Sequence, residues 1–295
     1  MEKIFHIVDV FAEEKYSGNQ LAVFVNGDLY SDGEMQRLAR ETNFSETTFI
    51  MPLASSGDTY RVRIFTPHEE IPFAGHPTLG TVYIIIKEIL ISRPGSIVLD
   101  LNAGKIPVSA SYDSEGNIER LVMSQLEPSF GPVMEKTQAA KILGLTEEEI
   151  EDSLPVQEVS TGLPVIIAPL KSLDSVRRVR LDSGLLSGHF EKFNARGMLV
   201  FCPETYEKQN RLNVRAFFHH YGVPEDPATG SANGCLAGYL LKHRYFGADS
   251  FEISVEQGYE IERKSVLYLS ASSDGGKFNI RVGGKVKHIA CCRLV

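Results

Sequence analysis

The sequence is poor in cysteine and has no pair of cysteines in a CxxC arrangement. Its four cysteines, Cys202, Cys235, Cys291 and Cys292, also lack a zinc-binding spacing with histidine. We therefore expect small, buried thiols in a reducing compartment and no metal site. Adjacent Cys291 and Cys292 would point to opposite faces of a strand.

Long apolar runs and excess positive charge are also missing. The longest apolar run, TVYIIIKEIL at 81–90, is too short to span a bilayer and contains Lys87 and Glu88. The start, MEKIFHIVDVF, alternates like a strand and has no signal-peptide core. The net charge is -8, from 30 basic and 38 acidic residues. We expect a cytoplasmic protein that binds neither nucleic acid nor membrane, although a local pocket can still hold a small anionic substrate.

The 295 residues, 43% of them hydrophobic, are enough for two domains of ordinary size. Short apolar strands alternate with helices, which predicts an α+β fold. A helix capped by Ser31 or Asp32 is expected at 31–43, and more apolar helices are expected at 77–90 and 231–243. The predicted strands cover residues 3–11, 19–25, 46–51, 59–66, 156–160, 163–170, 198–203 and 212–218.

A pattern in the first half of the chain returns in the second half. Arg63, in the strand VRIF, is followed by Gly75 and a helix, and Arg215, in VRAF, is followed by Gly230 and a helix. The offset is 152 residues between the arginines and 155 between the glycines. The order of strand, loop and helix favours a duplication. Two similar domains would bring two helix N-termini to one cleft, where their free N–H groups would bind an anion.

The two loops before these helices carry candidate functional side chains. In PFAGHPTLG, Gly75 permits close backbone approach, and His76 lies at the helix start. In PEDPATGSANG, Asp226, Thr229 and Ser231 precede or open the second helix. Helix capping accounts equally well for His76 and in part for Asp226 and Ser231. The surplus of polar groups at the second helix favours a ligand.

Four segments together resemble the phenazine-biosynthesis isomerase-like family, and the resemblance covers nearly the whole chain. The segments are SGNQLAVF, NFSETTFI, PFAGHPTLG and EDPATGSA. The resemblance implies the fold of diaminopimelate epimerase, with two similar domains, each a mixed, barrel-like sheet around a long central helix. It implies domains at 1–117 plus 285–295 and at 118–284, with the active site in the cleft between them, and a homodimer.

The same resemblance implies a cofactor-independent isomerase that moves a proton on a cyclic carboxylic acid, similar to dihydro-hydroxyanthranilate isomerase. Glu46 would be the catalytic acid/base, acting with His76 and Asp226; on the pattern alone, Glu46 would be a solvated carboxylate at a strand start. The substrate-binding residues would be Asn19, Gly75, Gly230, Ser231 and Thr229. A general base needs a pKa near the working pH, and burial would raise that of Glu46.

Other functions fit the sequence less well. A racemase of this fold would have a cysteine at each helix start, where His76 and Ser231 stand. A Ser231–His76–Asp226 triad lacks the GxSxG elbow. Metal binding by His219, His220, Glu225 and Asp226 would require adjacent histidines to converge, although a strand makes them diverge. The main alternative is a non-catalytic small-molecule-binding or protein-interaction protein on the same scaffold.

Overall fold

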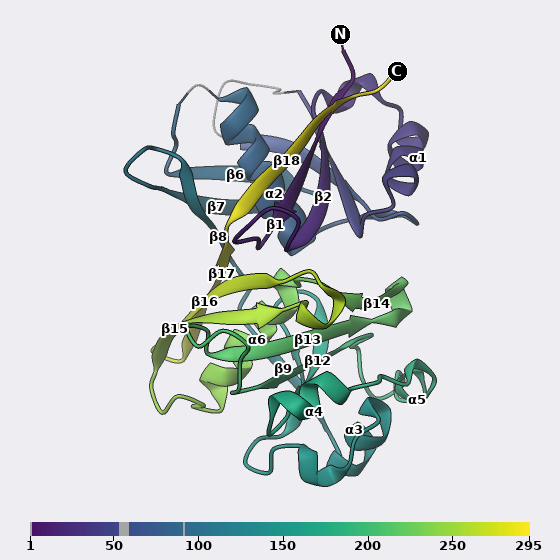
Figure 1. Cartoon of the computed structure of the whole chain (residues 1–295), viewed down its shortest axis with the longest axis vertical. Coiled ribbons are helices and arrows are strands. Elements are labelled where there is room, and N and C mark those ends of the chain that lie inside the picture. The colour runs from purple at the N-terminus through teal and green to yellow at the C-terminus, as the bar shows by residue number, and fades with distance from the viewer. Residues whose placement is uncertain (1, 53–58, 91) are drawn as a thin grey trace. The chain divides into compact units, whose positions relative to one another are not determined.

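The computed structural model describes residues 2–52, 59–90 and 92–295 (Figure 1). The chain divides into two compact units, Met1–Ser124 with Gly283–Val295, and Gln125–Val282. The first unit therefore contains both chain ends, because its last strand comes from the C-terminus.

The first unit is built on one mixed sheet with the strand order β18-β1-β2-β3-β4-β6-β7-β8. The pairs β2/β3 and β4/β6 are parallel, the other pairs are antiparallel, and β5 pairs with β4. The strands are β1 (Ile4–Val10), β2 (Asn19–Phe24), β3 (Glu46–Ile50), β4 (Thr59–Phe65), β5 (Glu70–Ile71), β6 (Ser96–Leu101), β7 (Gly104–Tyr112), β8 (Ile118–Ser124) and β18 (Val286–Arg293).

Helix α2 (Gly75–Ile84) is the buried helix of this unit, and the π-helical turn η2 (Ile85–Ile89) continues it. It packs against strands from both ends of the sheet, including β18 and β1 as well as β7 and β8. The helix approaches the sheet closely at Gly80, where a Cβ atom would lie 2.6 Å from Leu21 and 2.9 Å from Val10. An apolar helix with a glycine on its contact face can therefore pack closely against the sheet.

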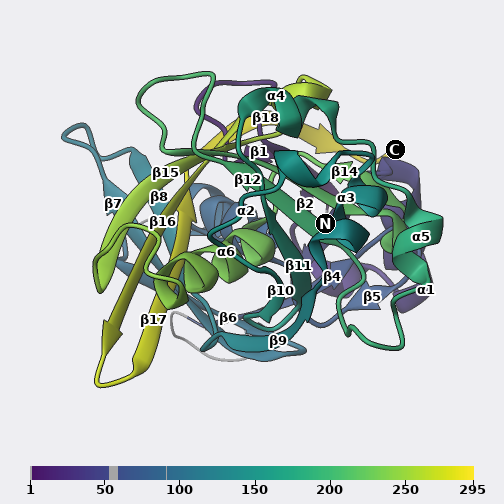
Figure 2. The ribbon, with the colours of Figure 1, turned by 90° about the horizontal axis from the view of Figure 1, so that it is seen from below.

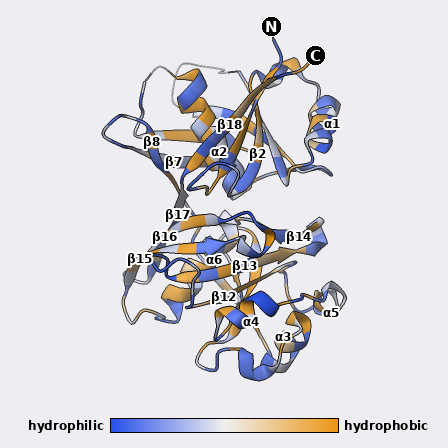
Figure 3. Cartoon of the chain, viewed as in Figure 1, coloured by the Kyte–Doolittle hydropathy of each residue, from blue (hydrophilic) through white to orange (hydrophobic). Residues whose placement is uncertain are grey.

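Helix α1 (Asp32–Thr42) covers the other face of the first unit and is amphipathic. Ser31 caps it through a capping box with Glu34, while Met35 and Ala39 face the core. Hydrophilic and hydrophobic colours both appear on this helix in Figure 3. The short 3-10 turn η1 (Gly27–Leu29) precedes it.

The second unit has a sheet with the order β9-β10-β11-β12-β13-β15-β16. Its parallel pairs are β11/β12 and β13/β15, and β14 pairs with β13. The strands are β9 (Ser129–Met134), β10 (Val156–Ser160), β11 (Pro164–Pro169), β12 (Met198–Cys202), β13 (Leu212–Phe218), β14 (Val223–Asp226), β15 (Ser250–Gln257), β16 (Ser265–Asp274) and β17 (Lys277–Gly284).

Helix α6 (Gly230–Lys242) is the buried helix of the second unit and packs against β10, β11 and β16 (Figure 2). The outer face of this sheet carries α3 (Lys136–Leu143), α4 (Leu173–Arg178) and α5 (Ser183–Ser187), whose apolar residues share one core cluster. The remaining 3-10 turns are η3 (Glu147–Glu149), η4 (His219–Tyr221) and η5 (Tyr259–Ile261).

The structure confirms the mixed α+β class and the expected helix starts near Ser31, Pro77 and Ser231. One expectation was wrong. Cys202 and Cys235 are buried, but Cys291 is exposed and Cys292 is half-buried, because the last residues of β18 alternate between exposed and half-buried positions up to the C-terminus. His219 and His220 lie on the 3-10 turn that directly follows β13. Within the described residues, no helix is both long and apolar enough to cross a membrane.

Candidate active site

In the first unit, three expected site residues come together where β2, β3 and α2 begin. Asn19 is the first residue of β2, Glu46 is the first residue of β3, and His76 is in the first turn of α2. Because β2 and β3 are parallel, with Leu21 opposite Glu46, both strands start at the same edge of the sheet. We call Asn19, Glu46, Gly75 and His76 the α2 entrance.

Glu46 and His76 form a close pair in this entrance. His76 Nε2 lies 3.4 Å from Glu46 Oε2, and the two side chains are 5% and 18% exposed. Glu46 is thus not the solvated carboxylate that its position at a strand start suggests. Burial lowers the pKa of His76 from 6.5 to about 3, against a smaller opposing effect of a hydrogen bond to the Gln20 backbone. His76 is therefore neutral at physiological pH.

The tautomer of His76 follows from its contacts. Nε2 has no hydrogen-bond partner within the described residues, so the bond to the Gln20 carbonyl is made by Nδ1. Nδ1 carries the hydrogen of the neutral ring, and Nε2 faces Glu46 as an acceptor. His76 thus bonds to β2 and does not cap its own helix.

A buried hydrogen bond fixes β3 against α2. The hydroxyl of Thr81 in α2 donates to that of Thr48 in β3 at 2.8 Å, and both residues are fully buried. Thr48 is two residues from Glu46, and Thr81 is little more than one helical turn from His76. This bond therefore limits how far the carboxylate and the imidazole can move apart.

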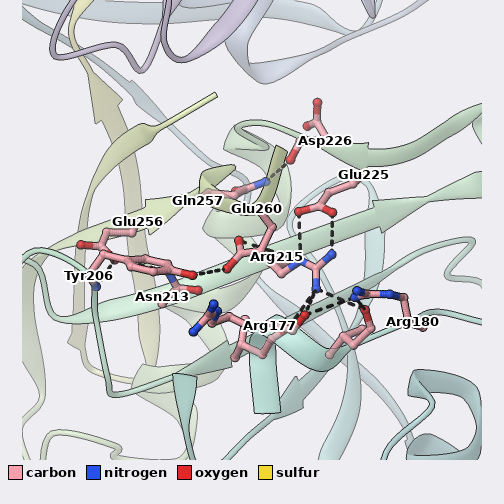
Figure 4. A network of polar contacts seen from close by, with 12 residues as sticks. Arg177, Arg180, Tyr206, Asn213, Arg215, Glu225, Asp226, Glu256, Gln257 and Glu260 are labelled. Atoms are coloured by element: carbon pink, nitrogen blue, oxygen red, sulfur yellow. Dashed lines mark hydrogen bonds and ion pairs between the residues drawn. The ribbon is translucent and has the colours of Figure 1, made fainter. Parts of the chain in front are cut away.

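In the second unit, the start of α6 is organised by Gln257, a fully buried residue at the end of β15. Its amide nitrogen donates to the Asp226 carbonyl at 2.8 Å (Figure 4). The same nitrogen donates to the Thr229 hydroxyl at 3.0 Å. Its amide oxygen accepts from the Thr229 backbone at 3.2 Å and from Asn233 at 2.8 Å. Gln257 therefore fixes the turn between β14 and α6. We call residues 226–231 the α6 entrance.

The expected site residues of the second unit lie in this entrance. Asp226 is 8% exposed, and one of its carboxylate oxygens accepts a hydrogen bond from the Thr229 hydroxyl. Thr229 is the N-cap of α6, which begins at Gly230, and the half-buried Ser231 follows in the first turn. The Thr229 hydroxyl thus holds Asp226, and neither Asp226 nor Ser231 is the N-cap residue.

Both entrances follow an arginine–glutamate pair of the same geometry. Arg63 donates to Glu70 from Nε at 2.8 Å and from Nη2 at 2.7 Å. Arg215 donates to Glu225 in the same way, at 3.0 and 2.7 Å (Figure 4). The offset is 152 residues for the arginines and 155 for the glutamates, which places the three-residue difference in the loop between them.

The structure does not favour the cysteine racemase or the metal site that we considered from the sequence. Cys235 is fully buried beside Thr161, and burial raises the pKa of its thiol to about 11, which suits packing better than acid–base work. Glu225 is bound to Arg215, and no group of three potential metal ligands among the described residues includes it. Among the described residues, the one group of three potential metal ligands is His6, Glu88 and His288.

Sequence reasoning missed Gln257, Asn233 and the Arg–Glu pairs as supports of the entrances. Gln257 gave no signal, because it lies 28 residues beyond Thr229 in an ordinary strand. The arginines did give a signal, because both belong to the repeated VR-x-F pattern. Their half-buried glutamate partners stand just before the two loops.

Comparison with known sequences gives a consistent result over almost the whole chain. The sequence model of the family described as "Phenazine biosynthesis-like protein" matches residues 8–289. An uncharacterized isomerase of Pasteurella multocida is 32% identical over 98% of this chain and 93% of its own length. The trans-2,3-dihydro-3-hydroxyanthranilate isomerase of Pseudomonas aeruginosa is 33% identical over 94% of each chain.

Solved structures show the same relationship. A phenazine biosynthesis protein of the PhzF family from Bacillus anthracis superposes with a TM-score of 0.91 at 27% identity, covering 100% of this chain and 99% of its own. A hydroxyproline epimerase from Agrobacterium vitis has a TM-score of 0.64 at 10% identity, over 99% of this chain and 90% of its own. The second likeness shows the fold alone, which is epimerase-like.

Proposed function

Because the chain belongs to the phenazine biosynthesis-like protein family, we propose that it is an isomerase that moves a proton within a small cyclic carboxylic acid. The relatives named above are isomerases, which agrees with the enzyme class expected from the sequence. The observation that carries the proposed mechanism is the Glu46–His76 pair, 3.4 Å apart and largely buried. No cofactor has a role in this mechanism.

In the proposed reaction, the Glu46 carboxylate takes a proton from a ring carbon of the substrate. The electron pair of the broken C–H bond spreads into the conjugated ring and its carboxylate, and the protonated Glu46 then returns the proton to another carbon. His76 Nε2, as an acceptor, would receive a hydrogen bond from the protonated Glu46 carboxyl. Such a bond stabilises the protonated form of Glu46, from which the proton is returned.

The α6 entrance is proposed to bind and orient the substrate. Asp226, held by the Thr229 hydroxyl, would act with Glu46 and His76 in catalysis as a fixed negative group facing a polar substituent. The N–H groups near Gly75–His76 and Gly230–Ser231 would bind the substrate carboxylate, since helix starts attract anions. Asn19 and the Ser231 hydroxyl would complete the binding set. The partner implied is therefore a small anionic substrate, whatever the net charge of the chain.

The proposal includes a duplicated fold, in which the two units are the two copies. The strand order supports it: β18-β1-β2-β3-β4-β6-β7 matches β9-β10-β11-β12-β13-β15-β16, with parallel pairs at the same places. The Arg–Glu pairs repeat as well. Catalysis by a homodimer is part of the same proposal.

Turnover in heavy water tests the proposal against the binding-protein alternative. The wild-type chain should convert trans-2,3-dihydro-3-hydroxyanthranilate, or another cyclic dihydro acid, to a double-bond isomer detected by NMR. Deuterium in the product would show that the transferred hydrogen exchanges with solvent during the reaction. Saturable binding of these acids without any isomer would overturn the isomerase proposal and favour a binding protein.

A further inference from the structure

Three potential metal ligands from three separate elements meet in the first unit, away from the α2 entrance. His6 lies in β1, Glu88 in η2 and His288 in β18. His6 Nδ1 is 3.1 Å from His288 Nε2, and His288 Nδ1 is 3.7 Å from Glu88 Oε1. One ligand atom from each residue lies within 4.8 Å of the other two.

A β-bulge brings His288 to the same face of the sheet as His6. The pairing of β1 with β18 runs from Ile7 opposite Ala290 to Val8 opposite His288, so Ile289 is the extra residue. Residues directly opposite share a face, as do residues two apart in one strand. Val8 and His6 therefore share a face with His288, whereas an unbulged strand would place His288 opposite Asp9 and on the other face.

A second irregularity positions Glu88. Helix α2 ends in the π-helical turn η2, where the Leu90 N–H donates to the Ile85 carbonyl five residues earlier at 2.9 Å. Single π-turns in otherwise regular helices occur often at functional sites, as do β-bulges. Here a bulge and a π-turn supply two of three side chains that converge on one point.

We propose that His6, Glu88 and His288 bind one divalent transition-metal ion, with Zn²⁺ as the ion of best fit. Two imidazoles and one carboxylate are a common zinc ligand set, with bonds of about 2.0 to 2.2 Å that place ligand atoms roughly 3.4 Å apart in a tetrahedron. His288 can bind the ion through only one of its two nitrogens, and one ligand atom from each of the three residues already lies within 4.8 Å of the other two. Small side-chain rotations therefore complete the site, and a water molecule takes the fourth position.

The ion would act on the structure of the first unit and leave the proposed chemistry alone. Glu88 follows His76 by twelve residues, so the site is on the order of 18 Å along the helix from the α2 entrance. A metal bound here joins β1, the C-terminal strand β18 and the end of α2. It would therefore hold the C-terminal strand in place and stabilise the folded state in proportion to its occupancy.

Zinc titration of the full-length chain, freed of any histidine tag, tests the site. Calorimetry of the wild type should show saturable binding of one Zn²⁺ per chain and a Zn²⁺-dependent rise in Tm. His288→Gln and Glu88→Gln should each weaken binding by at least about tenfold. Both residues are partly exposed, so these variants should fold, which far-UV circular dichroism without metal checks. His6 is buried and is left unchanged.

Matched controls separate this site from other ligands. His68→Gln removes an exposed histidine of the same unit and should leave zinc binding unchanged. Cys291→Ser with Cys292→Ser tests the thiols beside the site on β18 and should also leave it unchanged. The proposal would be overturned if the wild type showed no saturable zinc binding. It would also be overturned if His288→Gln and Glu88→Gln bound zinc as tightly as the wild type, or if only the cysteine variant lost binding.

Discussion

The two helix entrances share a scaffold and differ in chemistry. Each follows a strand whose arginine is held by a glutamate on the next short strand, and each opens a buried helix. The α2 entrance carries an acid and a neutral imidazole facing each other, Glu46 and His76. The α6 entrance carries Asp226 within hydrogen bonds organised by Gln257. The difference supports the proposed division of roles, in which the α2 entrance transfers the proton and the α6 entrance orients the substrate.

The two arginine–glutamate pairs differ in burial, so we expect their loss to lower the free energy of unfolding by different amounts. Arg215 and Glu225 are 7% and 10% exposed, whereas Arg63 and Glu70 are 19% and 26% exposed. Arg215→Ala should lower the free energy of unfolding by about 3 to 5 kcal/mol, because it leaves a buried carboxylate without its partner. Arg63→Ala should cost only about 1 kcal/mol. Urea unfolding measures both changes in stability. Equal losses of unfolding free energy in the two variants would contradict the difference expected from burial.

Titration of His76 should make the α2 entrance sensitive to acid. Its pKa is about 3 in the folded state and near 6.5 when unfolded, so the unfolded chain binds the proton more readily. This residue therefore contributes stability that is complete above pH 6.5 and declines as the pH falls from 6.5 toward 3, by up to a few kcal/mol. In His76→Gln, urea unfolding should lose that part of the pH dependence. An unchanged slope between pH 6.5 and 4 would contradict the depressed pKa.

Gln257 has no charge, yet the α6 entrance should depend on it. Gln257→Leu leaves the Thr229 N–H and the Asp226 carbonyl without their partner and should cost about 2 kcal/mol of stability. It should also raise KM more than it lowers kcat, since Asp226 would lose its position. Gln209→Leu, at an exposed position, is the control. A Gln257→Leu enzyme with wild-type KM would remove Gln257 from substrate positioning.

Ser231 should give the smallest change in stability and still affect substrate binding. It lies half-buried on the first turn of α6, after the N-cap residue Thr229. Ser231→Ala should therefore change the free energy of unfolding by at most about 1 kcal/mol and should raise KM. Parallel losses of Tm and activity would instead assign Ser231 to the stability of the helix.

The sequence predicted the starts of the two buried helices because the signals there are local. Gly75, His76, Gly230 and Ser231 stand where apolar helices begin, and the repeated VR-x-F pattern marked the strands before them. The pairing of Glu46 with His76 was not visible, because it depends on two strand starts and a helix start lying at one sheet edge.

Local sequence patterns could not predict contacts between residues far apart in the chain, or the exposure of single residues. The His6–His288 contact joins residues 282 apart in sequence, and a bulge with no sequence signal brings them to one face. The exposure of Cys291 follows from its place near the free end of β18, which composition does not show. Strands β6 to β9 were not assigned, because β7 to β9 are largely exposed or half-buried and lack a strong apolar pattern.

The central claim is that Glu46 carries the proton, and Glu46→Gln tests it most directly. Glutamine keeps the size and the hydrogen-bonding reach of the side chain but cannot exchange a proton as a carboxyl does. We predict a fall in kcat of roughly 100- to 10,000-fold, with folding and substrate affinity nearly unchanged, and wild-type kcat for Glu41→Gln, an exposed carboxylate on α1. A Glu46→Gln enzyme with a kcat close to that of the wild type would contradict the account.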